Sequence, residues 1–497
     1  MEKADDSIKL FNVRYLPLFA AFFLLGIFCV KVSITVAAVL WTVAAFCAAA
    51  LLFGKRIKAW VAVALVAALF VGFGAAKAEL YYRNKVGLGG KTEVSCRVVS
   101  VEENDGVYTV VADSLCRDRS YSGEAVFSTE QALAPGDRIR VYGEISIRPL
   151  SLDSLSEAMK YRKGYKYQIE SAEVLSVTEG NPPLNLRIRE GARNLLIEKQ
   201  GERAGGFSYA MMFGDAEYME EADKTAMREV GVAHVFAISG LHIGVLAGAL
   251  LFLLRKLKVK DGVSLLILLL IFGFYAYLVG FTPSVLRAAI MVSVGLLASH
   301  FGARYDDISA LSFAAILILI VRPLLLFDLS FIMSFLSIFG LHSLSRPLKK
   351  AFQNKGVKEK LAEALSLSIA TTIALLPVSA VVFGRISLVG FLLNLVVVPL
   401  ASVSYVITLI GVLLTAVIPS FGAVLCVTAL LPRAISEVSA WAASLGFTAK
   451  YNFSAAEILV YYAVLLFVGK YSLAAKKVKL VAGGMGAGVL ALLIFAV

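Results

Sequence analysis

The chain has 497 residues, of which 59% are hydrophobic and 17% are charged, and its mean hydropathy is +0.79. Soluble domains carry about 25% charged residues, so this composition excludes an ordinary soluble protein and predicts a polytopic membrane protein. The formal net charge of +12 gathers in short loops between apolar segments, at 55–58, 255–260, 346–360 and 470–479. Such loops stay cytoplasmic under the positive-inside rule, so most of this charge indicates topology.

The first predicted domain, residues 1–78, is a transmembrane region. Apolar runs of about 17 to 25 residues are long enough to cross a bilayer as helices. Three such runs occur here, at Leu16–Val32, Ile34–Phe53 and Ala59–Ala78. Basic residues before the first run predict a cytoplasmic N-terminus, and no cleavable signal is evident because the first run leads directly into the second. After three crossings, the next region is expected outside the cytoplasm.

Residues 79–182 form the second predicted domain, which is rich in β structure. Apolar and polar residues alternate in TEVSCRVVSVEEN, GVYTVVADS, DRIRVYGEISI and YQIESAEVLSV, as they do in half-buried strands. Turn sequences such as Asn104-Asp105-Gly106 and Pro135-Gly136-Asp137 separate these segments. About four or five short strands favour a small barrel of the OB type, with a mixed sandwich as the alternative.

Two cysteines of this domain, Cys96 and Cys116, are candidates for a disulfide. An oxidising exterior would allow them to pair. The alternative is two separate buried thiols.

One outer segment is a candidate surface for single-stranded DNA. It interleaves rings with cations, which together bind bases by stacking and the backbone by charge. The candidate residues are Tyr161, Arg162, Lys163, Tyr165 and Lys166, with Arg138 and Arg140 extending the same face. The alternative is an ordinary surface strand whose tyrosines pack inward.

After an amphipathic connector at 183–231, residues 232–497 form the second predicted membrane domain. Its predicted helices lie at Val232–Leu254, Val263–Phe281, Pro283–Phe301, Ile308–Val321, Leu325–Leu341, Leu361–Phe383, Ser454–Val468 and Leu480–Val497. Ile386–Ile418 holds one or two crossings, with Asn394 and Pro399 marking a broken helix whose freed carbonyls need a cavity or protein cover. Ala423–Phe447 is predicted to be interfacial, which gives about ten to twelve spans in the whole chain.

The first helix of this domain combines small and polar residues. Gly240, Gly244 and Gly248 recur every fourth residue and predict a smooth stripe for close helix packing. Ser239 and His242 lie three residues apart, on a neighbouring face. Polar groups at membrane depth are costly unless they face protein or water, so this helix is predicted to line a hydrated passage. The alternative for His242 is a bond to a neighbouring carbonyl. His234 lies nearer the outer surface.

Arg287 is the best candidate for a cation that lines this passage. An ionisable side chain at membrane depth is costly unless it faces protein or water. The alternatives are a structural ion pair or an interfacial position. Asp328 is a candidate partner of Arg287 or a cap of the helix that begins near Leu329.

Enzyme motifs fail on inspection. GLGGKT, from Gly87 to Thr92, lacks the first glycine of a phosphate-binding loop, so no ATPase is predicted. The four histidines, at 234, 242, 300 and 342, are too scattered for a His-x-His-x-Asp-His zinc site. Ser239 and His242 lack an acidic partner for nucleophilic catalysis. We therefore expect no enzyme activity, no metal and no cofactor.

Several strings together resemble the ComEC competence protein family. The block FSYAMMFGDAEYMEEADKTAMREVGVAHVFAISGLHIGVL is similar to the segment that opens that family's membrane domain. GFTPSVLRAAIM, with Arg287, RPLLLFDLSFIMSF and LLPVSAVVFGRISLVGFLLNLVVVP are similar to its later elements, and LAPGDRIRVYGEI and LSEAMKYRKGYKYQIESAEV to its outer OB part. The likeness covers nearly the whole chain. This chain departs from the family at Ile332, where a glutamine is usual, and it is expected to be a short form without the C-terminal metallo-β-lactamase-like domain.

The resemblance implies a channel in the cytoplasmic membrane that takes up single-stranded DNA during natural transformation. Such a conduit needs a hydrated lining with a few cations and donors, but no tight clamp that would trap a polyanion. In it, Arg287 would line the path and His234 would meet phosphate at the entrance. The partners it implies are single-stranded DNA, membrane lipid, an external DNA receptor, a separate nuclease, a cytoplasmic motor protein and further copies of the chain. A transporter of an anionic lipid or small solute would use the same helix breaks and Arg287. An intramembrane hydrolase built on Ser239 and His242 is a third, weaker alternative.

Overall fold

The computed structural model describes residues 20, 24 and 91–468, except 105, 117–124, 148–166, 237, 239, 388, 450 and 452. The helices predicted within 16–78 and 480–497 lie outside the described residues. So do Ser239 and the outer candidates Tyr161, Arg162, Lys163, Tyr165 and Lys166. The described residues form two compact units. One contains the described part of 20–191 together with 315–329, and the other contains that of 192–314 and 330–468.

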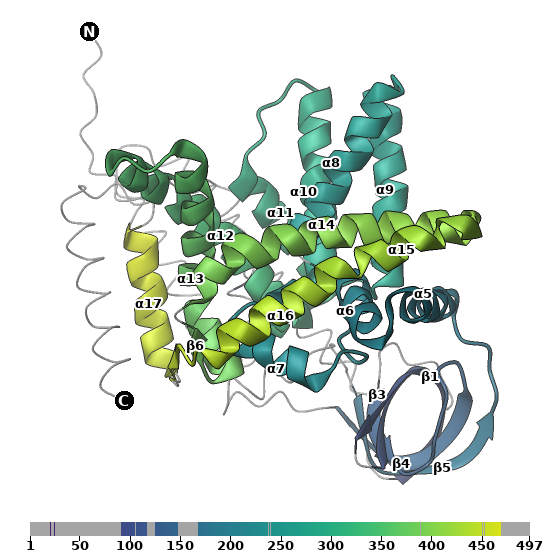
Figure 1. Cartoon of the computed structure of the whole chain (residues 1–497). Helices are drawn as coiled ribbons and strands as arrows, with labels where there is room; N and C mark the ends of the chain where they lie inside the picture. The colour runs from purple at the N-terminus through teal and green to yellow at the C-terminus, as the bar shows by residue number, and fades with distance from the viewer. Residues whose placement is uncertain are drawn as a thin grey trace, which may run out of the picture. The chain divides into compact units, whose positions relative to one another are not determined.

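The first unit contains a closed β-barrel, which Figure 1 shows as a ring. Its strands are β1 (Lys91–Asn104), β2 (Val107–Cys116), β3 (Ala125–Thr129), β4 (Arg138–Ile147) and β5 (Tyr167–Thr178). They pair in the order β1-β2-β3-β5-β4, and β4 closes the ring on β1. Inward side chains such as Val98, Val110 and Phe127 are almost fully buried. The predicted OB-like barrel is therefore confirmed.

The predicted turn at Pro135-Gly136-Asp137 ties the start of β4 to β1. The Gly136 amide donates to the Val98 carbonyl, and the Val98 amide donates to the Asp137 carbonyl, both at 2.8 Å. Gly136 has φ +105°, and a Cβ there would lie 2.7 Å from the backbone nitrogen of Pro182. Only glycine fits both constraints.

The two barrel cysteines are free thiols on opposite faces of the sheet. Cys116 lies opposite Ser95 in the β1–β2 register, and both residues are exposed. Cys96 is the next residue after Ser95, so strand alternation turns it into the core, where it is 4% exposed. The disulfide considered from the sequence is not formed.

We expect these two thiols to differ strongly in reactivity. Cys116 should react with a maleimide in the folded protein, whereas Cys96 should react only after unfolding. Burial raises the pKa of the Cys96 thiol to about 12, so little reactive thiolate forms at neutral pH. Mass spectrometry of labelled peptides measures this, and equal labelling of both residues in the folded protein would contradict the buried placement of Cys96.

The second unit begins with the segment predicted as an amphipathic connector. It forms α5 (Leu184–Gln200), whose first residues belong to the other unit, α6 (Glu202–Phe213), α7 (Glu221–Glu229) and the 3-10 helix η2 (Ala233–Val235). Every residue of α6 from Ala204 to Phe213 is buried. Phe207 and Met211 of α6 pack in one core with Leu393 and Val397. This segment is therefore part of the core of the helical unit.

Apolar helices follow, at bounds that differ from several predictions. They are α8 (Gly240–Lys256), α9 (Asp261–Leu278), α10 (Pro283–His300), α11 (Asp307–Val321), α12 (Leu329–Asn354), α13 (Glu359–Phe383), α14 (Gly390–Val417), α15 (Gly422–Thr428), α16 (Leu430–Ser444) and α17 (Ala455–Val468), with short 3-10 helices η3 (Pro323–Phe327) and η4 (Pro419–Phe421). Within the described part of the chain, six segments are long and apolar enough to cross a membrane: α9, α10, α12, α13, α14 and Pro419–Ser444. These segments and the barrel together confirm the predicted fold class.

One prediction about the later helices is wrong. The helix expected to break at Asn394 and Pro399 runs without interruption as α14. Pro399 lies on an exposed side of α14, while Val397 and Ala401 beside it are fully buried, so packing holds the helix together across the proline. Most of the segment predicted to be interfacial, Ala423–Phe447, belongs to Pro419–Ser444, which is long and apolar enough to cross a membrane, and its interfacial position stays a prediction.

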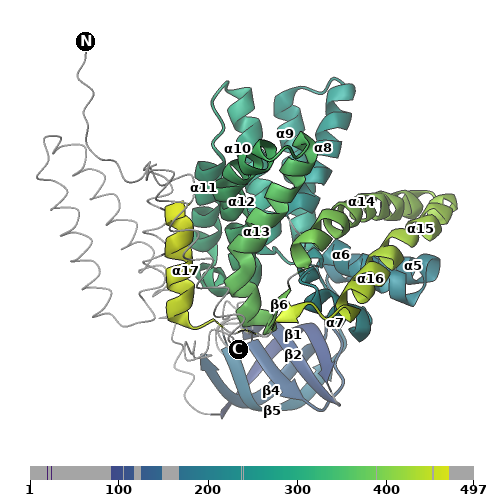
Figure 2. The ribbon, with the colours of Figure 1, turned by 60° about the vertical axis from the view of Figure 1, so that its left-hand side comes forward.

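Within the helical unit, α14, α15 and α16 form a layer that crosses other helices. Figure 1 and Figure 2 both show α14 beside α15 and α16, running across the direction of α8, α9 and α10. Two short strands, β6 (Ile386–Ser387) and β7 (Thr448–Ala449), pair antiparallel and join the chain before α14 to the chain after α16. This strand pair therefore connects the start of the α14–α16 layer to its end.

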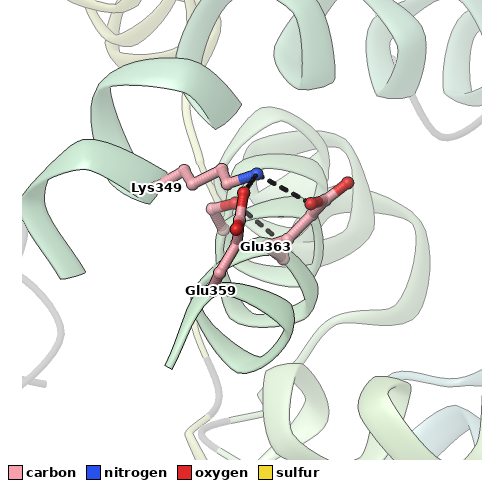
Figure 3. Close-up of polar contacts among 4 residues, drawn as sticks. Lys349, Glu359 and Glu363 are labelled. Carbon is pink, nitrogen blue, oxygen red and sulfur yellow. Dashed lines mark hydrogen bonds and ion pairs between the residues drawn. The ribbon is translucent and has the colours of Figure 1, made fainter. Parts of the chain in front are cut away.

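Small residues and surface charges join α12 to α13. A Cβ on Gly340 would lie 2.9 Å from the Ala370 carbonyl oxygen, so the two helices touch closely there. Nearer the connection, the Lys349 ammonium contacts the carboxylates of Glu359 (3.2 Å) and Glu363 (2.8 Å), as Figure 3 shows. Both carboxylates are largely exposed, so these ion pairs contribute little stability, about 0–1 kcal/mol each.

Candidate functional site

A buried cation lies where α8, α10 and α12 meet. Arg287 is in the second turn of α10 and is 3% exposed. Its helix begins with Pro283, a residue that favours the first helical position. Ser284 precedes Arg287 by three residues, so both project from one face of α10. We use the name Arg287 junction for the group formed by Gly240, Ser284, Arg287, Ser330 and Ser334.

The guanidinium is held by a main-chain carbonyl. Its Nη1 donates to the Ser334 carbonyl at 2.5 Å, and its buried Nε has no hydrogen-bond partner. One helical turn away, the hydroxyls of Ser284 and Ser330 are 2.9 Å apart. Among the described residues, no carboxylate pairs with this guanidinium, and an uncompensated buried charge costs several kcal/mol. Such a charge is a candidate for binding an anion.

Gly240 allows α8 to approach this cation. A Cβ on Gly240 would overlap the Nη2 atom of Arg287. By contrast, a Cβ on Gly244 or Gly248 would meet none of the described atoms within 4 Å, and both residues are exposed. Of the three glycines in the predicted stripe, Gly240 alone makes a close contact within the described part of the chain.

His242 joins α8 to α14 through ring stacking. It is 2% exposed, and its imidazole lies against the Tyr405 ring with centroids 4.7 Å apart and planes inclined by 23°. His234, on η2, is half-buried and near enough for the two imidazoles to interact electrostatically. His242, which is predicted to border a hydrated passage, is therefore packed in this conformation.

One face of α14 carries buried polar atoms without partners. Asn394 Oδ1, Ser404 Oγ and Thr408 Oγ1 have no hydrogen bond among the described residues. Their spacing places them within one side of the helix. Buried polar atoms in native proteins are nearly always satisfied, so each of these marks a place for water or a ligand group.

Asp328 and the barrel arginines were the remaining candidates. Asp328 is 7% exposed and directly precedes α12, in the position of a helix cap. Arg140 on β4 is exposed and pairs with Glu93 at 3.2 Å. Arg138 is exposed as well and lies opposite Arg97, whose guanidinium binds Asp113. Carboxylates thus compensate part of this basic face.

A polar network absent from the predictions joins α5, α6 and α15. The Gln200 side chain donates to Thr428 Oγ1 at 2.8 Å and accepts from Ser208 Oγ at 2.7 Å. Gln200 is 2% exposed, so both ends of its amide are satisfied in the core. Gln200 and Thr428 are 228 residues apart, and no local motif marks either of them.

No cluster of three or more potential metal ligands occurs among the described residues. A family profile described as "Competence protein" matches residues 211–475, which is more than half of the chain. The match contains the whole Arg287 junction and the His242–Tyr405 stack.

Three curated proteins are similar over part of the chain. ComE operon protein 3 of Bacillus subtilis is 33% identical over 218 residues, which cover 44% of this chain and 27% of that protein. The uncharacterized protein YcaI of Escherichia coli is 28% identical over 190 residues, 36% of this chain and 25% of that protein. Recombination protein 2 of Haemophilus influenzae is 26% identical over 221 residues, 41% of this chain and 28% of that protein.

The matched region thus spans about a quarter of the length of these relatives. No solved structure matches the chain. The family match, the apolar helices and the barrel agree with one another. The chain is a multi-pass membrane protein that belongs to the Competence protein family.

Proposed function

We propose that this protein takes part in DNA uptake during natural transformation, with its helical unit as the conduit for a single strand. Membership in the Competence protein family supports a role in competence. The strand would reach the conduit from outside the cell, where we place the barrel. A separate nuclease, an external receptor and a cytoplasmic motor would supply the remaining steps.

The Arg287 junction is the observation that carries this proposal. A guanidinium bound to one main-chain carbonyl, with its Nε unpaired, can exchange that carbonyl for a phosphate oxygen. A carboxylate partner would compete with phosphate far more strongly than a carbonyl does. The cation is therefore suited to brief contact with a moving phosphate backbone.

The conformation described here is closed around this cation. Arg287 is 3% exposed and His242 is 2% exposed, so a strand can reach them only after α8 moves away from α10. Gly240 contributes no side chain to the contact between α8 and α10. We infer that separation of α8 from α10 and α12 opens the conduit and exposes the guanidinium.

The rival functions have less support. A solute transporter would use a broken helix at Pro399, because unwound backbone builds such sites, whereas α14 is unbroken. An intramembrane hydrolase would use His242 as a base, whereas its ring stacks face to face on Tyr405. The unbroken α14 does not favour a solute transporter over the DNA conduit, and the stacked His242 ring does not favour a hydrolase over it.

We expect deletion of the gene in a naturally transformable host to abolish internalisation of labelled DNA. Binding of DNA at the cell surface should persist, because the conduit acts after capture. The measurement is nuclease-resistant label inside the cells, with the wild-type gene restored from a second locus as the control. Unchanged internalisation in the deletion strain would refute a role in uptake. Reconstituted protein that moves a small anion and ignores single-stranded DNA would favour the transporter instead.

A further inference from the structure

The barrel carries a groove between two of its strands that the DNA conduit does not use. The groove has a volume of about 920 Å³ and is lined by β2, by β3 with the two residues after it, and by β5. Its lips are 126–131 on one side and 168–174 on the other. A groove of this size accepts a short peptide or a ligand of similar volume.

The groove exists because β3 and β5 separate after a short contact. Their parallel pairing covers two positions, Ala125 with Tyr167 and Val126 with Gln168. Farther along, β5 carries a bulge: Ser171 and Ala172 lie between Glu170 and Glu173, while β4 has only Gly143 between the partners of those two residues. A bulge bends its strand and increases the local twist. It therefore turns the edge of β5 away from β3.

Two strand edges consequently face the groove. Residues after Val126 pair with β2 on one side of β3, and β5 from Ile169 onward pairs with β4 on one side. Among the described residues, neither segment pairs with another strand on its groove side. Unpaired edges of this kind are templates for an added strand, which binds through main-chain hydrogen bonds.

The negative charge of the groove indicates that the added strand is cationic. Glu130, Glu170 and Glu173 line it and are exposed, and the lining contains no lysine, arginine or histidine. None of the three carboxylates forms an ion pair with any described residue. Glu170 also lies directly opposite Glu144 on β4, a like-charge pair that is unfavourable. A cationic ligand would relieve this repulsion, whereas a phosphate backbone or a second acidic edge would add to it.

We propose that this groove binds an extended, lysine- or arginine-rich segment of a partner protein, which adds as a strand between β3 and β5. The six residues of the β3 lip correspond to about five or six residues of an added strand, at about 3.3 Å per residue. Main-chain bonds to the two lips hold the segment, and alternate cationic side chains reach the three glutamates.

The test uses the full chain in detergent and a fluorescein-labelled hexapeptide that alternates lysine with valine. We expect saturable binding by fluorescence anisotropy. Combined substitution of Glu130→Gln, Glu170→Gln and Glu173→Gln should weaken binding at least about tenfold, because attraction between close opposite charges is lost. The matched control changes three exposed carboxylates outside the groove, Glu179→Gln, Glu198→Gln and Glu202→Gln, and should leave the affinity within about twofold.

A second peptide tests the strand geometry. N-methylation of alternate residues removes main-chain donors along one edge without changing charge, so this peptide should lose most of its binding. Equal binding of the methylated peptide, or equal loss in both triple variants, would show only general electrostatic attraction and overturn the proposal. Protection of Cys96 from maleimide confirms that each variant retains its barrel.

Discussion

Replacing Arg287 with methionine should reduce DNA internalisation about tenfold or more while leaving the protein at least as stable as the wild type. The expected effects on DNA internalisation and on stability have opposite directions. The buried guanidinium attracts a polyanion, but its burial destabilises the folded state. Burial without a carboxylate destabilises the folded state, so an apolar side chain of similar length removes a penalty. In the same variant, a passing phosphate backbone would lose its contact with this buried cation.

Loss of the Arg287 hydrogen bond leaves no new unsatisfied carbonyl. The Ser334 carbonyl also accepts a bond from Ser337 Oγ at 2.9 Å, and this bond remains in the methionine variant. The unpaired Nε disappears with the guanidinium. The structure therefore offers no reason for Arg287→Met to misfold, and any fall in uptake reports the missing charge.

Internalised label and the thermal unfolding midpoint in detergent should be measured on the same preparations. Arg287→Lys is the matched control, because it keeps the charge and loses the planar fork that binds two phosphate oxygens at once. We expect it to retain more uptake than Arg287→Met. A methionine variant with full uptake would end the case for Arg287 as the cation of the conduit, and a large loss of stability would assign the residue to structure.

The sequence predicted the barrel well because its determinants are local. Strand alternation and the Pro135-Gly136-Asp137 turn depend on neighbouring residues, and the structure has both where they were expected. The bulge at Ser171 and Ala172, which opens the groove, has no such signature. It depends on how β5 fits against Gly143 on β4, a residue far away in the chain.

The helical unit shows where local patterns fail. The apolar run that predicts a helix from Val232 gives a 3-10 turn first, and α8 begins at Gly240. Pro399 predicts a break that buried neighbours prevent. Arg287 was recognisable as an unusual residue, but its contacts were not, because Gly240 and Ser334 lie 47 residues before and after it in the chain. Those contacts follow from how three helices pack.

Alanine at Gly240 should destabilise the protein by about 1–3 kcal/mol, because the added methyl group overlaps the buried guanidinium of Arg287. The same substitution at Gly244 or Gly248 should be neutral or stabilise by about 0.5–1 kcal/mol, since alanine is the better helix former and a Cβ at either position meets no described atom within 4 Å. The three variants thus make one chemical change along one helix, and a loss of stability is expected at Gly240 alone. Thermal unfolding midpoints in detergent rank the stabilities of the three variants. Equal effects at all three positions would contradict the close contact between Gly240 and Arg287.

A double variant separates packing from charge at the same contact. If the methyl group at 240 collides with the guanidinium, Gly240→Ala should cost little once Arg287→Met has removed it, with a coupling energy of about 1–2 kcal/mol. DNA internalisation should stay low in that double variant, because restored packing does not restore the cation. Additive losses of stability would show that α8 meets something other than Arg287 at this position. If the double variant regained both stability and DNA internalisation, the conduit would depend on the packing of α8 against position 287 and not on the charge of Arg287.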